Sequence, residues 1–112
     1  MRATIDDRIR LEAEVQCLVK QMEDLGAVKV ILFGSLARGQ ISLFSDIDLL
    51  VLFDKGLSPR ALTLWVYQNI QSGEAVDILA YDRKHFNEVR ERPFLSHILA
   101  EGKVLYERLG NQ

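Results

Sequence analysis

The sequence has few of the residues from which many small functional sites are built, with one cysteine and two histidines among 112 residues. A lone cysteine, Cys17, cannot form an internal disulfide and cannot supply a cysteine-rich metal site. Cys17 lies near the apolar side of a helix that we predict over residues 4–25, so we expect it to be a small, partly buried core residue. His85 and His97 are isolated and lack metal-ligand spacing, so we expect them to be surface or packing residues.

Long hydrophobic runs and a large excess of charge of one sign are also missing. No stretch approaches the roughly 18 apolar residues of a membrane span, and the N-terminus lacks the apolar segment of a signal peptide. Fourteen basic and sixteen acidic residues give a formal net charge of -2, which provides no general attraction to nucleic acid or to an anionic membrane. We therefore expect a cytoplasmic protein with neither a membrane nor a nucleic acid as partner, in which any binding of phosphates is local.

The composition is that of an ordinary globular protein, with 48% hydrophobic and 27% charged residues, and the length suits one domain over residues 1–112. Apolar residues at three- and four-residue steps predict a helix over residues 4–25, with Thr4 as its N-cap. Further helices are expected from Ser58 onward and on either side of Pro93.

Short apolar runs predict strands over residues 28–33, 46–53, 75–81 and 103–106. This alternation of helices and strands indicates an α/β (α+β) fold, in which helices pack on a small mixed β-sheet.

Two carboxylates, Asp46 and Asp48, stand at the head of the most apolar run, DIDLLVLF. Side chains alternate between the faces of a strand, so both should project to one side. Two ionised carboxylates on one face repel, which costs stability unless a cation lies between them or one takes up a proton. Mg2+ is usually held by one or two carboxylates plus substrate phosphates. If the next strand is a neighbour in the sheet, Asp77 would join them, and three carboxylates can hold two metal ions.

The turn after the first predicted strand suits a phosphate group. Gly34 allows the backbone to approach a phosphate closely, and the Ser35 hydroxyl and the amides of the turn can donate hydrogen bonds to it. Arg38 could supply positive charge, and Gly39 lets the chain turn away. The sequence therefore predicts a phosphate cradle followed by a metal-binding edge.

Each of these pieces alone is a weak signal, because Gly-Ser is common in turns and Asp-x-Asp is common in solvated loops. Their order is more specific: an apolar strand, Gly-Ser, ten residues, Asp-x-Asp opening a second apolar strand, and a third aspartate in another strand. A purely structural role explains this order poorly, since three charges would sit in otherwise buried strands without evident partners. A Walker loop is excluded, because Gly-Lys-Ser/Thr is absent.

The motifs GSLARG, SDIDLLV and VDIL, with HILAEGKVLYE near the end, resemble the DNA polymerase beta-like nucleotidyltransferase superfamily, and most closely its minimal nucleotidyltransferase branch. The resemblance covers residues 30–106. It implies that Gly34 and Ser35 hold the triphosphate of ATP, the nucleotide donor. It also implies that Asp46, Asp48 and Asp77 bind two Mg2+ ions. Larger members carry a further helical domain that grips the acceptor, and we expect none here.

Minimal members of this kind are often paired with a small helical HEPN-domain protein, as the antitoxin of a toxin–antitoxin pair, and some transfer AMP from ATP to a tyrosine of the toxin. The resemblance thus implies Mg2+-dependent nucleotidyl transfer to a hydroxyl group, and a hetero-oligomer with such a partner or a homodimer. Two alternatives stay open. One is a non-catalytic binding module that neutralises its partner by occlusion, and the other is a nucleotidyltransferase acting on a small molecule.

Overall fold

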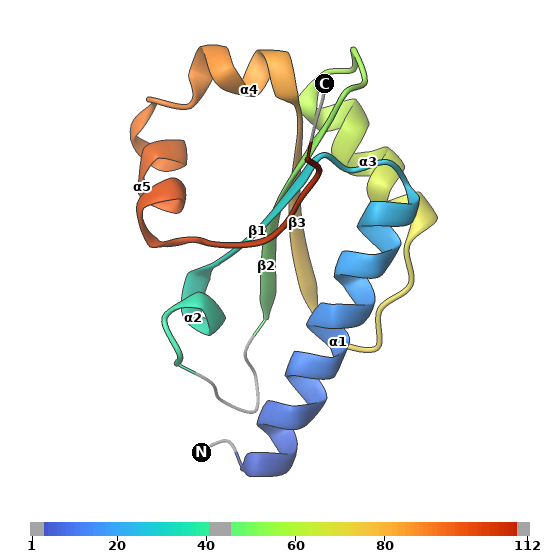
Figure 1. Ribbon diagram of the computed structural model, residues 1–112, viewed down its shortest axis with the longest axis vertical. Helices are drawn as coiled ribbons and strands as arrows, with labels where there is room; N and C mark the ends of the chain where they lie inside the picture. The colour runs from blue at the N-terminus through green and yellow to red at the C-terminus, as the bar shows by residue number, and fades with distance from the viewer. Residues whose placement is uncertain (1–3, 41–45, 110–112) are drawn as a thin grey trace.

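The protein is a four-stranded mixed sheet with helices on both faces (Figure 1). The computed structural model describes residues 4–40 and 46–109. The strands lie in the order β3-β2-β1-β4, in which β1 pairs antiparallel with β2 and β4 while β2 pairs parallel with β3. Their bounds are β1 Lys29–Phe33, β2 Ile47–Phe53, β3 Val76–Asp82 and β4 Lys103–Glu107. The predicted fold class is confirmed.

The helices form two layers around the sheet (Figure 1). One face is covered by α1 (Ile5–Asp24) and α3 (Pro59–Asn69), and the other by α4 (Arg83–Val89) and α5 (Pro93–Glu101). The short helix α2 (Gly34–Ala37) directly follows β1, at the end of the sheet where β2 and β3 begin. Within the described ranges, no helix is both long and apolar enough to cross a membrane.

Strand β2 lies inside the sheet and is buried along nearly its whole length, which explains its almost continuous apolar sequence. Leu49 and Val51 belong to the core beneath α1 and α3, whereas Leu50 and Leu52 belong to the core beneath α4 and α5. The strand is therefore packed from both sides, and Asp48 is its one residue that is only partly buried.

Local sequence sets the starts of the two long helices. Thr4 caps α1 in a reciprocal capping box with Asp7, and Ser58 caps α3 by accepting a hydrogen bond from the amide of Ala61. Pro59 occupies the first turn of α3, where its missing N–H costs nothing. These starts agree with the sequence prediction.

The prediction for Cys17 was wrong, because its side chain is exposed. The buried positions of α1 include Leu11, Val15, Leu18 and Met22. One residue corresponds to about 100° around a helix, so Cys17 lies beside this stripe rather than on it.

Candidate active site

Asp48 and Asp77 lie side by side at the start of two neighbouring strands. The parallel register of β2 and β3 makes them Cα partners. The condition set by the sequence, that the strand of Asp77 be a neighbour of the strand of Asp48, is therefore met. On the other side of Asp48, the antiparallel register places Phe33, the residue before α2. The sheet thus brings the end of β1 and the starts of β2 and β3 to one place.

Gly34 packs directly against the Asp48 carboxylate. A Cβ atom at Gly34 would collide with the carboxylate oxygen and would lie 3.0 Å from its Cγ. The backbone of Gly34 also has a φ of 77°, in the left-handed region that favours glycine. Both the close approach and the backbone conformation therefore require glycine here, and they hold the turn of α2 against the carboxylate.

The electrostatic environment of Asp48 disfavours its ionised form. Desolvation by burial and the negative charges of Asp77 and Asp46 raise its pKa from 3.8 to about 6, and hydrogen bonding with Asp77 acts in the same direction. Arg38 opposes this shift by lowering the pKa, but it does not outweigh the other causes. A bound cation would relieve this repulsion between the carboxylates.

The three aspartates are not equally buried, which corrects one premise of the sequence analysis. Asp46 precedes β2 and is exposed, and Asp77, the second residue of β3, is exposed as well. Only Asp48 is partly buried. The cost of burying charge therefore falls mainly on Asp48.

The remaining predicted site residues belong to α2 and its end. Ser35 is the second residue of α2, and its carbonyl accepts a hydrogen bond from the amide of Gln40 at 2.8 Å. Arg38 is the C-cap of the same helix, and its Nη1 lies 2.7 Å from Oε2 of Glu101, at the end of α5. Glu101 lies in the motif HILAEGKVLYE, but local sequence patterns could not assign it a role, because it is 63 residues from Arg38.

Comparison with known proteins identifies the family. Residues 14–110 match the family described as polymerase beta, nucleotidyltransferase. The chain belongs to this nucleotidyltransferase family.

Similar proteins support the same fold and family. A Methanocaldococcus jannaschii protein named "Putative protein adenylyltransferase" is 33% identical over 78 residues, which is 70% of this chain and 77% of that protein. A solved "putative minimal nucleotidyltransferase" is 28% identical, with a TM-score of 0.57 and coverage of 90% of this chain and 98% of the other. A toxin–antitoxin crystal structure with AMP-PNP contains a chain that is 23% identical, with a TM-score of 0.59 and coverage of 83% and 73%.

Carboxylates at the strand starts are the type of side chain that binds a divalent cation. Over residues 4–40 and 46–109, no group of three His, Cys, Asp or Glu side chains is gathered closely enough to hold a metal ion, so the predicted set of three aspartates is not assembled there. The pair of Asp48 and Asp77 does fit the chemistry of Mg2+, which takes hard oxygen ligands and usually needs only one or two carboxylates besides substrate phosphates.

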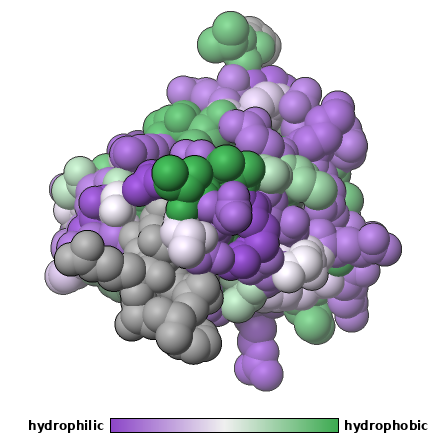
Figure 2. All heavy atoms as spheres, turned by 90° about the horizontal axis from the view of Figure 1, so that it is seen from below, coloured by the Kyte–Doolittle hydropathy of each residue, from purple (hydrophilic) through white to green (hydrophobic). Residues whose placement is uncertain are grey.

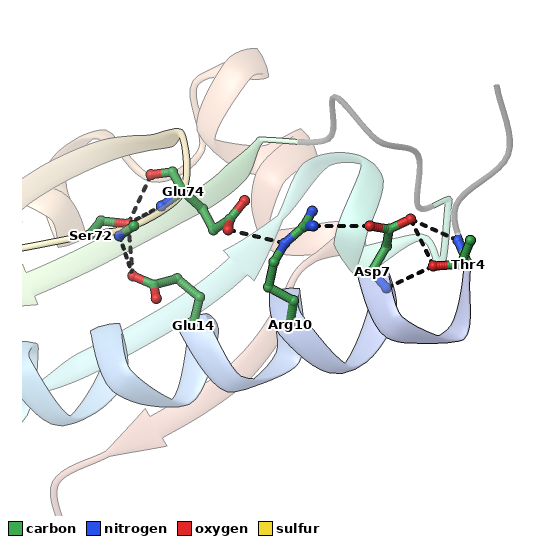
Figure 3. A network of polar contacts seen from close by, with 7 residues as sticks. Thr4, Asp7, Arg10, Glu14, Ser72 and Glu74 are labelled. Carbon is green, nitrogen blue, oxygen red and sulfur yellow. Dashed lines mark hydrogen bonds and ion pairs between the residues drawn. The ribbon is translucent and has the colours of Figure 1, made fainter.

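The segment that leads into β3 is fastened to α1 by polar contacts (Figure 3). Arg10 bridges Asp7 and Glu74, with nitrogen–oxygen distances of 3.0 and 3.1 Å. Glu14 accepts hydrogen bonds from the Ser72 hydroxyl and from the amide of Gly73, at 2.9 and 3.0 Å. These contacts fix the chain three residues before Asp77, and they supplement the pairing with β2 that sets the position of that carboxylate.

The end of the molecule that carries α2 is mostly hydrophilic, with small hydrophobic patches (Figure 2). The exposed carboxylates Asp46 and Asp77 lie at the strand starts of this same end. The site of this family member therefore opens toward solvent.

Proposed function

We propose that this chain is a cytoplasmic, Mg2+-dependent nucleotidyltransferase that transfers AMP from ATP to a hydroxyl group, with residues 1–112 acting as one minimal nucleotidyltransferase domain. The observation that carries the proposal is the pairing of Asp48 with Asp77 beside the Gly34 turn, in a chain of this family. The name of the archaeal relative and the AMP-PNP bound in the toxin–antitoxin structure support ATP as donor and a protein as acceptor.

The proposed roles follow from position. Gly34 and Ser35 would hold the triphosphate, because the turn offers backbone amides and a hydroxyl next to the carboxylates. Arg38 would add positive charge to the same phosphates. Asp48 and Asp77 would hold Mg2+, with substrate phosphates as further ligands. For two Mg2+ ions to bind, Asp46, which lies just before β2, would have to join this pair as the third carboxylate. When bound, Mg2+ would neutralise phosphate charge and lower the pKa of the acceptor hydroxyl.

The reaction exchanges one bond for another at the α-phosphorus of ATP. The acceptor oxygen forms a bond to this phosphorus, and the bond from the phosphorus to the oxygen that bridges the α- and β-phosphates breaks. Pyrophosphate leaves, and the proton of the acceptor hydroxyl passes to the Asp77 carboxylate, which is exposed and therefore accessible to an incoming group.

The acceptor we propose is a tyrosine of a HEPN-domain toxin, with this chain as the antitoxin. The similarity to a chain of a toxin–antitoxin pair supports a toxin partner. The assembly would then be a hetero-oligomer, and a homodimer is the other arrangement to be tested by mass measurement in solution.

Labelled ATP tests the transfer. The purified chain is incubated with MgCl2, ATP labelled at the α-phosphate, and the cognate HEPN-domain protein, and transfer of label to the partner is followed on denaturing gels. We expect labelling by the wild type, and at least a hundredfold slower labelling by Asp48→Asn and by Asp77→Asn. Asp24→Asn is a matched control, because Asp24 is an exposed aspartate at the end of α1.

Occlusion without chemistry predicts a different pattern. If the Asp46→Asn/Asp48→Asn variant neutralises the partner in cells as well as the wild type does, and no label is transferred, the enzyme proposal is wrong. Transfer of label to a small molecule but not to the protein would contradict the proposed acceptor and leave nucleotidyl transfer intact.

A further inference from the structure

Arg38 ends α2, the helix that packs against Asp48, and its side chain contacts a residue of another helix. Its Nη1 donates to Oε2 of Glu101 at 2.7 Å, and its Nε lies 3.5 Å from Oε1 of Gln40. At the start of the same helix, Gly34 packs against the Asp48 carboxylate. The contact with Glu101 therefore holds the guanidinium at the end of the helix that borders the aspartates.

Glu101 is itself firmly placed. It is the last residue of α5, its side chain is only 15% exposed, and its Oε1 lies 2.8 Å from Nε2 of His97, one turn earlier in the helix. The next residue, Gly102, packs so tightly that a Cβ there would lie 2.6 Å from Cγ2 of Ile31 on β1. The junction between α5 and β4 therefore packs tightly against the sheet. This packing and the contact with His97 restrict the position of the Glu101 carboxylate.

We propose that Glu101 is a positioning residue, which holds the Arg38 guanidinium in place for the triphosphate of ATP. This inference rests on the proposed function. A free arginine on the surface samples many rotamers, and ordering it on binding weakens affinity. The carboxylate of Glu101 engages one end of the guanidinium, so the donors that remain are oriented before the nucleotide arrives.

The same contact could instead compete with the nucleotide, since Glu101 places a negative charge beside the cation. The two roles have opposite consequences. If Glu101 positions Arg38, its removal weakens ATP binding. If Glu101 competes for Arg38, its removal strengthens ATP binding, because one negative charge near the site is lost.

Calorimetric titration of the whole chain with ATP in MgCl2 tests this without any acceptor. We expect Glu101→Ala to raise the dissociation constant for ATP by about three- to tenfold, the range of effect for loss of one ordered side chain. Glu101→Gln keeps the shape and an acceptor oxygen, so we expect a smaller rise. Glu107→Ala is the charge control, because Glu107 is an exposed carboxylate on β4 that pairs with Lys29.

A double-mutant cycle separates positioning from general damage to the fold. In an Arg38→Gln background, Glu101→Ala should cause no further loss of ATP affinity, because the group that it positions is gone. A loss that persists in this background, unchanged binding, or tighter binding by Glu101→Ala would each overturn the inference. If the wild type itself binds no ATP, the proposed function fails as well, whereas unchanged binding by Glu101→Ala removes only the role of Glu101.

Discussion

At the scale of single residues, the environment of Asp48 suits the binding of a cation but lowers the stability of the fold when the carboxylate is ionised. Its backbone is paired on both sides within the sheet, yet its carboxylate faces two other aspartates. Burial and these neighbours raise its pKa to about 6, so the folded state binds a proton more tightly than the unfolded chain does. Asp48 therefore stabilises the fold when protonated, and it costs stability when ionised.

The first prediction concerns the pH dependence that follows. The contribution of Asp48 to stability is fully present below pH 3.8 and is lost as the pH rises through about 6. The unscreened shift corresponds to roughly 3 kcal/mol, and solvent screening of this half-buried group reduces it to about 1 kcal/mol. Asp48→Asn should therefore be more stable than the wild type at pH 7 by about 1 kcal/mol, or about 4 °C in Tm.

Thermal unfolding at pH 4, 5, 6 and 7, without added metal, measures this difference. It should shrink toward zero near pH 4, where the wild-type carboxyl is also protonated. Glu91→Gln, in the exposed turn between α4 and α5, should show no such trend. An Asp48→Asn variant that is less stable than the wild type at pH 7 would contradict the assigned environment.

The second prediction concerns the two glycines that flank the α2 turn. Gly34 and Gly39 have nearly the same φ, 77° and 78°, but only Gly34 has a near neighbour, the Asp48 side chain. Gly39→Ala should cost about 1–2 kcal/mol for the left-handed backbone alone. Gly34→Ala should cost about 1 kcal/mol more, because its Cβ must displace the carboxylate.

Denaturant unfolding of both variants tests this comparison, since Gly39→Ala controls for the backbone strain. In an Asp48→Ala background the two substitutions should become similar in cost, because the collision is removed. Equal costs in the wild-type background would show that the carboxylate moves away freely.

At the scale of elements, the edge strand β3 is protected by the helix beside it. Thr63 and Tyr67, on α3, satisfy backbone groups along the outer edge of the strand. The Tyr67 hydroxyl accepts from the amide of Ile78 at 2.7 Å, and the Thr63 hydroxyl accepts from the amide of Ala80 at 3.0 Å. Because an open edge is a template for pairing with another chain, these hydroxyls both stabilise the strand and block its outer edge.

The third prediction removes one of these hydroxyls. Thr63→Val keeps the shape of the side chain but leaves the amide of Ala80 without its acceptor, at a position that is fully buried. We expect a loss of about 1–3 kcal/mol in the free energy of unfolding, together with faster aggregation on heating. Thr63→Ser retains the hydroxyl and should lose much less. A Thr63→Val variant as stable as the serine variant would argue against a role for the hydroxyl.

At the scale of the whole molecule, the site exists because three strands meet at one end of the sheet. β1 ends where β2 and β3 begin, the backbone pairing sets the register of these ends, and helices pack on both faces of the sheet. Polar contacts with α1 also hold residues 72–74, the segment just before β3, in place (Figure 3). A ligand that binds both the α2 turn and the carboxylates should therefore stabilise the entire sheet.

The fourth prediction is that ATP with Mg2+ raises the Tm of the wild type, since a ligand that binds only the folded state stabilises it by about 2.7 kcal/mol at a hundred times its dissociation constant. ATP with excess EDTA should give a much smaller rise, because the phosphates then meet unneutralised aspartates. Asp77→Asn should reduce the rise with Mg2+, and Asp24→Asn should not. Equal rises with Mg2+ and with EDTA would contradict a metal-dependent site.

The sequence by itself determined the elements, the fold class and the candidate residues, because these depend on local patterns. Helix caps at Thr4 and Ser58, the apolar run of β2 and the Gly-Ser turn all follow from neighbours within a few positions. The tertiary structure alone decided which residues meet. The parallel register pairs Asp48 with Asp77, Asp77 is left exposed at the start of β3, and the packing of α5 brings Glu101 to Arg38. Such contacts join residues that are 29 and 63 positions apart, and only the order of strands and the packing of layers fix them.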